Sequence, residues 1–178
     1  MPLIYITGVS GSGKSAVAEE LKKRGFEAID ADNEGYNFWH DNETNVIVPI
    51  PDEKIVHTPE WFAKYEWKSS IEKVTGLAEK AKKKTIFYCS TAGHEKELWK
   101  LYSKVICLVI DVNTLRQRIA TRSSNHFGKK PHELEAILKW LPGDETNYRK
   151  YGAVIVDATQ PLDKVVDDIL KIADSCLP

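Results

Sequence analysis

The sequence predicts an α/β fold of three layers, in which a parallel sheet of five strands is covered by helices on both faces. Two patterns predict it: short apolar runs alternate with segments of helical spacing, and a glycine-rich loop joins the first apolar run to the first helical segment. The length of 178 residues and the 42% hydrophobic composition predict a single domain over residues 1–178. Ligands of such a sheet bind beyond the carboxyl ends of its strands.

The apolar runs locate the strands, and the spacing of apolar residues locates the helices. The predicted strands are 3–7, 26–29, 85–89, 105–110 and 154–156. The predicted helices are 14–24, 114–122, 131–141 and 162–172. Gly25 ends the first helix, either Asn113 or Thr114 caps the second, and Pro131 suits the first turn of the third.

One segment interrupts this alternation. Residues 33–84 contain a predicted small hairpin around 41–45, followed by a long helical stretch that Thr58-Pro59-Glu60 opens. We interpret 33–84 as an insertion beside the ligand site.

Composition argues against several classes of partner. Twenty-five basic and 26 acidic side chains leave a formal charge of -1, which predicts no nucleic-acid partner. No apolar run reaches membrane-spanning length, so no membrane partner is expected. The N-terminus lacks the pattern of a signal peptide, and Cys89, Cys107 and Cys176 lack metal-ligand spacing, so we expect a cytoplasmic protein with free thiols.

Residues 8–15 match the phosphate-binding pattern G-x-x-x-x-G-K-S, here called the P-loop. Backbone N–H groups of such a loop point at phosphate oxygens, and the following helix adds its positive N-terminal end. Lys14 is expected to contact the β and γ phosphates of ATP, and Ser15 to hold Mg²⁺. A chance glycine-rich turn is the alternative, against which the flanking strand and helix argue. The predicted nucleotide site comprises Gly8, Val9, Ser10, Gly11, Ser12, Gly13, Lys14, Ser15 and Ala16.

Asp30 and Asp32 follow the second strand, so in extended chain both carboxylates would project to one side, facing the P-loop. Both are predicted to lie at the substrate. Either acid could serve as the base for an acceptor hydroxyl; we favour Asp32 as the base and Asp30 as a group that organises Mg²⁺. Ser90 and Thr91 follow the third strand, where many P-loop proteins carry an acid. An Asx turn is the alternative interpretation of the pair.

A basic helix end and a polar loop predict a lid over 118–132. Arg118 and Arg122, four residues apart on one helix face, would stabilise charge on a transferring phosphoryl group, and Arg118 would also bind the nucleotide. A solvated basic face is the alternative. Arg149 is predicted to reach the substrate, with a surface pair to Glu145 as the alternative.

Aromatic residues crowd the insertion and suit stacking on a planar base. Tyr36 and Trp39, close to the acidic pair, are predicted to bind the acceptor. For Trp61 and Tyr65, four residues apart on a predicted helix, packing in the core is the alternative.

Together these motifs resemble the small P-loop kinases that phosphorylate nucleoside monophosphates and metabolites. The P-loop with Cys89-Ser90 looks like gluconate kinases, and residues 25–32 look like dephospho-coenzyme A kinases, in which the last acid is the base. Shikimate kinases also carry a paired Asp-x-Asp at this strand end. The acceptor motifs of all three are absent. Residues 71–161 resemble a branch described as nucleotide or nucleoside kinases.

Residues and resemblance together predict a P-loop kinase fold and a Mg²⁺- and ATP-dependent kinase for a small acceptor. A nucleoside monophosphate or nucleoside is expected ahead of a sugar acid. The alternatives are a P-loop NTPase or nucleotide-binding regulatory protein, and a kinase for a non-nucleotide metabolite. The predicted lid and insertion favour a kinase over a regulatory NTPase.

Overall fold

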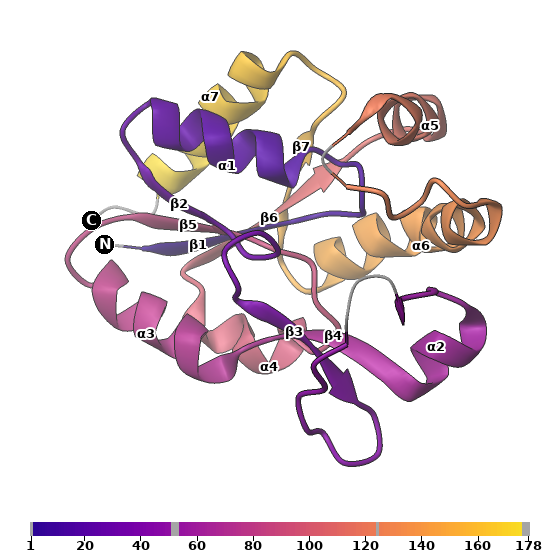
Figure 1. Cartoon of the computed structure of the whole chain (residues 1–178). Coiled ribbons are helices and arrows are strands. Elements are labelled where there is room, and N and C mark those ends of the chain that lie inside the picture. Colours follow the sequence, from indigo (N-terminus) through magenta and orange to yellow (C-terminus); the bar gives the residue numbers. More distant parts are fainter. Residues whose placement is uncertain (1, 51–53, 124, 176–178) are drawn as a thin grey trace.

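A parallel sheet of five strands forms the centre of the computed structural model, which describes residues 2–50, 54–123 and 125–175 (Figure 1). The strands lie in the order β2-β5-β1-β6-β7. Their bounds are β1 (Leu3–Thr7), β2 (Glu27–Asp30), β5 (Ile86–Cys89), β6 (Lys104–Val109) and β7 (Val154–Asp157). All five predicted strands are confirmed to within one residue at each end.

The strand order brings the sequence motifs to one edge. β1 is central and pairs in parallel with β5 on one side and β6 on the other, while β2 pairs in parallel with β5. The P-loop follows β1, Asp32 follows β2, and Thr91 follows β5. Because the carboxyl ends of parallel strands meet at one edge, these three segments lie together.

Helices cover both faces of the sheet, so the predicted three layers are confirmed (Figure 1). Alternate residues of β1 face different cores: Ile4 and Ile6 pack in one hydrophobic cluster, Leu3 and Tyr5 in the other. Val17 of α1 joins the first cluster. The first face is covered by α1 (Lys14–Lys23) and α7 (Leu162–Asp174), and the second by α3 (Ile71–Ala81) and α4 (Glu95–Leu98).

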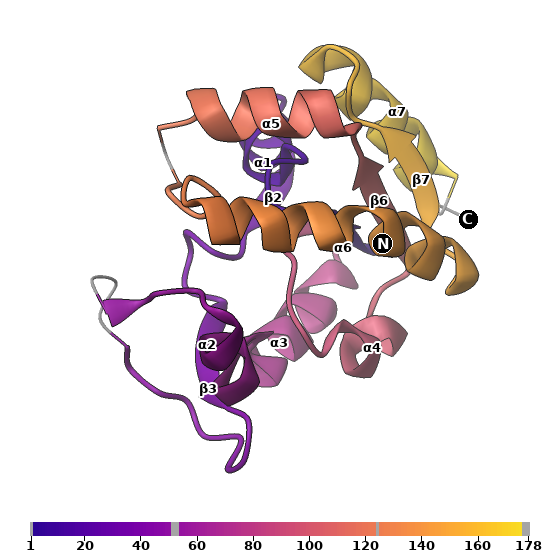
Figure 2. The ribbon, with the colours of Figure 1, turned by 90° about the vertical axis from the view of Figure 1, so that its right-hand side faces the viewer.

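Two further helices, α5 (Val112–Thr121) and α6 (Pro131–Lys150), run side by side at one end of the sheet (Figure 2). The carboxylate of Asp111 caps α5 by accepting a 2.7 Å hydrogen bond from the N–H of Thr114. The predicted cap at Asn113 or Thr114 is therefore wrong, because Asp111 already supplies the acceptor for the first turn.

The insertion forms a small antiparallel sheet of its own. Its strands are β3 (Asn37–Asp41) and β4 (Tyr65–Ser69), and the short helix α2 (Pro59–Lys64) precedes β4 directly. The prediction of one long helical stretch from Thr58 is wrong. Aromatic and polar residues alternate over 65–68 with the period of a strand, and this strand separates α2 from α3.

The ladder of β3 and β4 sets which side chains share a face. Asn37 lies opposite Ser69, and Trp39 lies opposite Trp67. These side chains lie on one face because alternate positions of a strand point the same way. The predicted small hairpin around 41–45 is also present, with an antiparallel bridge between His40 and Ile47 and a hydrogen bond from the N–H of Asp41 to the carbonyl oxygen of Val46.

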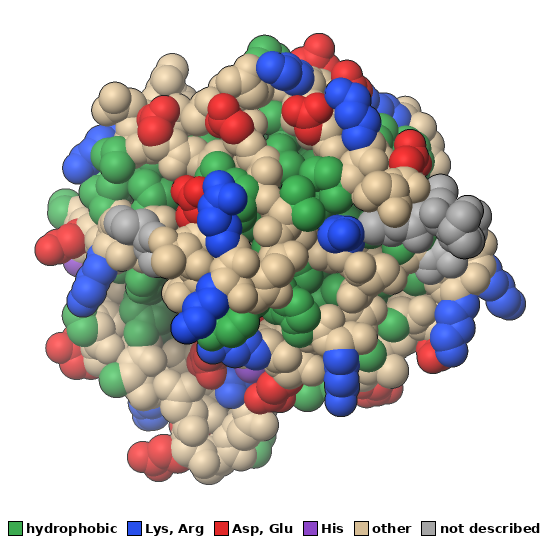
Figure 3. Space-filling view, turned by 180° about the vertical axis from the view of Figure 1, so that it is seen from behind, with side chains coloured by type: hydrophobic (Ala, Val, Ile, Leu, Met, Phe, Trp, Pro, Cys, Tyr) green, Lys and Arg blue, Asp and Glu red, His purple; other side chains and the backbone are tan. Residues whose placement is uncertain are grey.

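In the part of the chain that the structure describes, no helix is both long and apolar enough to span a bilayer. Cys89 and Cys107 are buried free thiols, as expected, whereas Cys176 lies outside the described residues. Residues 51–53 of the predicted insertion and Ser124 of the predicted lid also lie outside them. On the face opposite that of Figure 1, basic and acidic side chains are interspersed (Figure 3).

Candidate functional site

The P-loop needs glycine where it packs on β6 and where it starts α1. Gly8 has a φ of 143°, and a Cβ there would lie 2.5 Å from the carbonyl oxygen of Leu108. Gly13 has a φ of 106° and is the N-cap of α1, where no side chain caps the free N–H groups. The helix start is therefore open to bind an anion.

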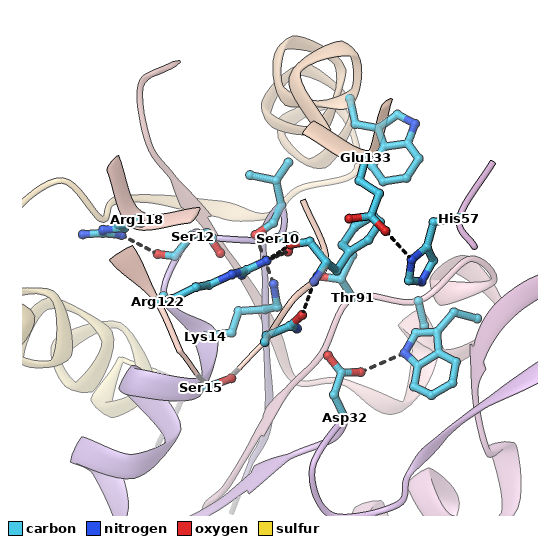
Figure 4. Close-up of a pocket in the computed structure, with 18 of the residues that line it drawn as sticks. Ser10, Ser12, Lys14, Ser15, Asp32, His57, Thr91, Arg118, Arg122 and Glu133 are labelled. Carbon is cyan, nitrogen blue, oxygen red and sulfur yellow. Dashed lines mark hydrogen bonds and ion pairs between the residues drawn. The ribbon is translucent and has the colours of Figure 1, made fainter. Parts of the chain in front are cut away.

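Lys14 folds back onto the P-loop. Its Nζ donates to the carbonyl oxygens of Gly8 at 2.6 Å and Val9 at 3.2 Å. Thr91 Oγ1 also donates to the Gly8 carbonyl, at 2.6 Å. Ser15 is exposed in the first turn of α1 (Figure 4). A phosphate group could replace the loop carbonyls as the partner of the lysine cation.

Arg118 and Arg122 reach the P-loop from the end of α5 (Figure 4). Arg118 donates to the carbonyl oxygen of Ser12 at 3.0 Å and to that of Ala158 at 2.7 Å. Arg122 donates to the hydroxyl of Ser10 at 3.2 Å. The structure thus brings the two predicted lid arginines to the predicted nucleotide site.

Two polar atoms beside these arginines are buried without a hydrogen-bond partner among the described residues: Ser12 Oγ and Arg122 Nε. Burial lowers the pKa of Arg118 and of Arg122, and the charges of Asp111 and Glu133, respectively, offset part of this effect. An unsatisfied donor and two desolvated cations favour an anionic ligand. This end of the site therefore fits a polyphosphate.

Asp32 follows β2 and is exposed to the space beside the P-loop (Figure 4). Its Oδ1 accepts a 2.8 Å hydrogen bond from Trp67 Nε1 and a 2.6 Å hydrogen bond from Asn37 Nδ2. Both donors belong to the small sheet of the insertion. The insertion thus holds the acid that the sequence favours as the base.

Asp30 does not share this position. β2 ends at Asp30, and a turn follows in which the N–H of Glu34 donates to the Asp30 carbonyl at 2.9 Å. Asp30 Oδ2 accepts a 2.8 Å hydrogen bond from Asn33. The expectation that Asp30 and Asp32 project to one side is wrong, because the extended chain does not continue to Asp32. A role for Asp30 at Mg²⁺ stays a prediction.

A cavity of about 1470 Å³ joins the P-loop to the insertion and the lid. Every residue predicted to bind the nucleotide lines it, except Gly8. Asp32 lines it as well, whereas Asp30 is not among its lining residues. Aromatic rings line the part beyond the P-loop, and we call them the aromatic wall: Trp39, His57, Phe62, Tyr65, Trp67, Phe127 and Trp140.

The two aromatic residues predicted to bind the acceptor are separated. Trp39 is buried in the wall, with its ring 5.1 Å from that of Trp67. Tyr36 is not among the residues that line the cavity, and its ring packs 5.8 Å from that of Tyr88 in the core. The chain enters β3 between them, so their side chains take different directions.

Arg149 also lies away from the cavity. Its Nη2 pairs with Glu145 at 2.9 Å on the surface of α6, which is the alternative that the sequence left open. The adjacent Tyr148 lines the cavity instead. Successive helix residues point about 100° apart, so the cavity receives only one of these neighbours.

Glu95 is a buried carboxyl beneath the P-loop that sequence reasoning missed. It accepts hydrogen bonds from the hydroxyls of Tyr5 and Tyr148, from Thr7 Oγ1 at 3.3 Å and from the N–H of Ala92 at 3.0 Å. Burial raises the pKa of Glu95, and the hydrogen bonds offset part of the rise. Most of these partners come from remote segments, so no local pattern indicates them.

A second missed contact joins the insertion to the start of α6. His57 Nδ1 lies 2.9 Å from Glu133 Oε1 (Figure 4). Glu133 is buried and also accepts from the N–H of Gly128 at 2.9 Å. His132 Nε2 lies 3.0 Å from the carbonyl oxygen of Val56. These contacts hold the two segments together at one side of the cavity.

Among the described residues, no group of three or more His, Cys, Asp or Glu side chains could hold a metal ion. Mg²⁺ at nucleotide sites is held mostly by phosphate oxygens and water, with one or two protein ligands. The exposed hydroxyl of Ser15, the last residue of the P-loop, fits such a shared site. The described residues do not fit a Mg²⁺ site built only from protein side chains.

A family profile described as an AAA domain matches residues 4–139. No curated protein matches the chain in sequence. The matched range contains the P-loop, Asp32, both lid arginines and nearly all of the aromatic wall.

Several solved kinase structures share the fold over nearly the whole chain. Shikimate kinase from Acinetobacter baumannii, in complex with shikimate, has a TM-score of 0.61 at 19% identity, covering 98% of this chain and 94% of that one. A sugar kinase from Janibacter sp. has a TM-score of 0.57 at 20% identity, covering 98% and 95%. Deoxyadenosine kinase from M. mycoides has a TM-score of 0.52 at 18% identity, covering 98% and 99%. The chain has the P-loop kinase fold.

Proposed function

The chain belongs to the AAA domain family and has a P-loop kinase fold, and from this premise we propose that it is a Mg²⁺- and ATP-dependent kinase. The proposed acceptor is a small molecule with a planar base, a nucleoside or nucleoside monophosphate. One observation carries the proposal: Asp32 lies in a single cavity between the P-loop and the aromatic wall. A phosphate site, an acid and a surface for a flat ring therefore occur in the order that phosphoryl transfer to such an acceptor requires.

The P-loop end supplies the positive groups. Lys14 would release the loop carbonyls and bind the β and γ phosphates, and Arg122 would direct its unpaired Nε–H at a phosphate oxygen. Arg118, held by two carbonyl groups, would keep its charge beside the nucleotide. Mg²⁺ held by Ser15 and the phosphates would offset negative charge on the transferring group.

At the other end, Asp32 would receive the acceptor. Its exposed carboxylate can accept a hydrogen bond from a hydroxyl group and thereby orient the attacking oxygen towards the γ-phosphoryl group. The cavity of about 1470 Å³ is large enough for two bound ligands. Water would be largely displaced when both are present, which would favour transfer to the acceptor over hydrolysis.

The aromatic wall supports a planar acceptor. Rings of Trp39, Trp67 and Tyr65 lie on the same side of the cavity as Asp32, on the small sheet of the insertion. Stacking of a base on an aromatic ring contributes about 1–3 kcal/mol. A sugar acid would instead need several polar groups directed at its hydroxyls.

The charges around the aromatic wall favour a nucleoside over a nucleoside monophosphate. Lys68 lies 3.0 Å from Glu66, and Lys130 lies 3.9 Å from Glu133. Each lysine of this part of the cavity therefore already has an acidic neighbour, and the arginines contact the P-loop. A second phosphate group would have to compete with these acids.

A screen of acceptors tests the proposal. Purified protein with Mg²⁺ and ATP is assayed for ADP release in the presence of nucleosides, nucleoside monophosphates, gluconate, shikimate and dephospho-coenzyme A. We expect nucleosides to stimulate ADP release most. Stimulation by gluconate or shikimate alone would reject the planar acceptor, and ADP release independent of any acceptor would indicate an NTPase.

A further inference from the structure

The carboxylate of Asp32 is held on one oxygen only. Oδ1 accepts from Trp67 Nε1 at 2.8 Å and from Asn37 Nδ2 at 2.6 Å. Within residues 2–50, 54–123 and 125–175, no donor contacts Oδ2. The two N–H groups therefore fix the plane of the carboxylate and leave its second oxygen open to the cavity.

A buried network fixes the orientation of the Asn37 amide. Asn37 is 3% exposed, and its Oδ1 accepts a 2.7 Å hydrogen bond from Ser69 Oγ. Its Nδ2 also donates to Ser90 Oγ at 3.0 Å, and the hydroxyl of Tyr88 donates to Ser69 at 2.9 Å. If the Asn37 amide were flipped, its carbonyl oxygen would face Asp32 and Ser90. The hydrogen bonds from Asn37 Nδ2 to Asp32 and from Ser69 Oγ to Asn37 Oδ1 would then be lost. The network thus keeps the N–H side of Asn37 towards Asp32.

The position of Trp67 is fixed in a different way. Trp67 lies opposite Trp39 in the β3–β4 ladder, and their rings are 5.1 Å apart. The indole packs in the aromatic wall, while its N–H donates to Asp32. One residue therefore links the surface proposed for the base to the acid proposed for the hydroxyl.

We infer that Trp67 and Asn37 are positioning residues that hold Asp32 Oδ1, so that Oδ2 receives the proton of the acceptor hydroxyl. This inference rests on the proposed function and adds to it how the acid is oriented. In the transfer step the acceptor oxygen bonds to the γ-phosphorus while the bond from that phosphorus to the β,γ-bridging oxygen breaks. The hydroxyl proton passes to Oδ2, and ADP leaves with the bridging oxygen.

Trp67→Phe tests the inference because it keeps an aromatic ring and removes the N–H donor. Trp61→Phe is the matched control, since Trp61 also packs against Trp39, with ring centres 5.5 Å apart, and its buried Nε1 has no hydrogen-bond partner in the described part of the chain. With the best acceptor from the screen, Trp67→Phe should lower kcat about tenfold and change the KM for ATP less than about twofold. Trp61→Phe should change neither by more than about twofold.

A double-mutant comparison with Asp32→Asn shows whether Trp67 acts by positioning Asp32 or only by packing. If Trp67 acts through Asp32, Trp67→Phe should cause no further loss of kcat in the Asp32→Asn variant. The inference is overturned if Trp67→Phe keeps the wild-type kcat, or if its loss is as large in the Asp32→Asn background. Asn37→Asp, which replaces the donating amide by a carboxylate, should lower kcat at least as much as Trp67→Phe.

The indole N–H signals in ¹⁵N NMR spectra provide a readout that needs no acceptor. Trp67→Phe and Trp61→Phe assign the two signals. Asp32→Ala should shift the Trp67 signal and leave the Trp61 signal in place; an unshifted Trp67 signal would overturn the contact. If wild-type protein phosphorylates no acceptor, the proposed function fails and the positioning role fails with it. Normal transfer by Trp67→Phe overturns the positioning role alone.

Discussion

At the scale of single residues, Lys14 supplies a positive charge at the proposed phosphate site. Its Nζ donates to carbonyl groups of its own loop, and Lys14 belongs to neither hydrophobic cluster, so it contributes little to the core. Lys14→Ala should therefore leave the protein folded and lower turnover by about two orders of magnitude, because one lost charge-stabilising group has an effect of this size. Thermal melting and acceptor-dependent ADP release measure the two effects.

Lys22→Ala is the control for Lys14→Ala. Lys22 lies on the same helix, is exposed and pairs with Glu34 at 2.6 Å. It should keep wild-type turnover. A folded Lys14→Ala variant with full turnover would contradict the assignment of the P-loop.

Glu95 makes a prediction about pH. Burial raises the pKa of Glu95 above its ordinary value of 4.5. A carboxyl whose folded-state pKa is raised contributes stability that is present below the unfolded-state value and is lost as the pH rises through the folded-state value. Glu95→Gln cannot ionise, so its free energy of unfolding should improve relative to wild type as the pH rises from 4.5 towards the raised folded-state pKa of Glu95. Urea denaturation of both proteins at several pH values measures this difference, and a difference independent of pH would contradict it.

Site residues that belong to a local motif could be predicted from the sequence. Site residues whose role depends on contacts with remote segments could not. Lys14 is fixed by the glycine pattern around it, and the structure brings it to the cavity. The direction of the Asp30 side chain depends on where β2 ends, and that of Arg149 depends on the phase of α6. Neither the strand end nor the helix phase can be predicted from the sequence to within one residue. Glu95 depends on partners from β1 and α6.

At the scale of elements, α5 carries both lid arginines to the P-loop. Arg118→Ala or Arg122→Ala should lower turnover more than ATP affinity, because each cation would act mainly on charge that develops during transfer. The expected loss in kcat is about tenfold or more for each variant. Steady-state kinetics and equilibrium binding of ATP separate the two effects.

Arg116→Ala is the matched control, since Arg116 is exposed on the same helix and is not among the residues that line the cavity. It should keep wild-type kinetics. Equal losses of ATP affinity and of kcat/KM in the Arg118 and Arg122 variants would indicate ordinary contacts to bound nucleotide instead.

The small sheet of the insertion gives a prediction for the acceptor. Trp39→Ala should raise the KM for the acceptor about five- to hundredfold, corresponding to the loss of about 1–3 kcal/mol of stacking, with the KM for ATP little changed. Because Trp39 is buried, Trp39→Leu serves as a control that keeps more of the packing volume. The same rise in KM in both variants would support stacking, whereas a wild-type KM in Trp39→Leu would assign Trp39 to the core.

Elements with a strong apolar pattern could be predicted, and the insertion could not. Each of the five strands of the central sheet contains a short apolar run, and β1, β5 and β6 are buried over most of their length. In the insertion, Thr58 and Pro59 correctly indicate the start of a helix. The alternation in β4 is short, however, and its partner strand β3 lies more than twenty residues earlier. Long-range pairing therefore decides the structure of this segment.

At the scale of the whole molecule, the fold places the P-loop, Asp32 and the aromatic wall around one cavity. Parallel strands bring the P-loop, Asp32 and Thr91 to one edge, and the insertion and lid enclose the space above them. The sequence predicts this layout because it follows from the order of strands and helices. It does not predict the contact of His57 with Glu133 that joins the insertion to α6, because the two residues lie in separate segments.

Direct measurement of phosphoryl transfer tests the central claim. The protein is incubated with Mg²⁺, a nucleoside and ATP, and ³¹P NMR spectra follow ADP, inorganic phosphate and the phosphorylated nucleoside together. We predict that ADP and phosphorylated nucleoside form in equal amounts, and that Asp32→Asn slows both by about two orders of magnitude. Formation of ADP and inorganic phosphate in equal amounts, with the nucleoside unchanged, would contradict the proposal that this protein is a nucleoside kinase.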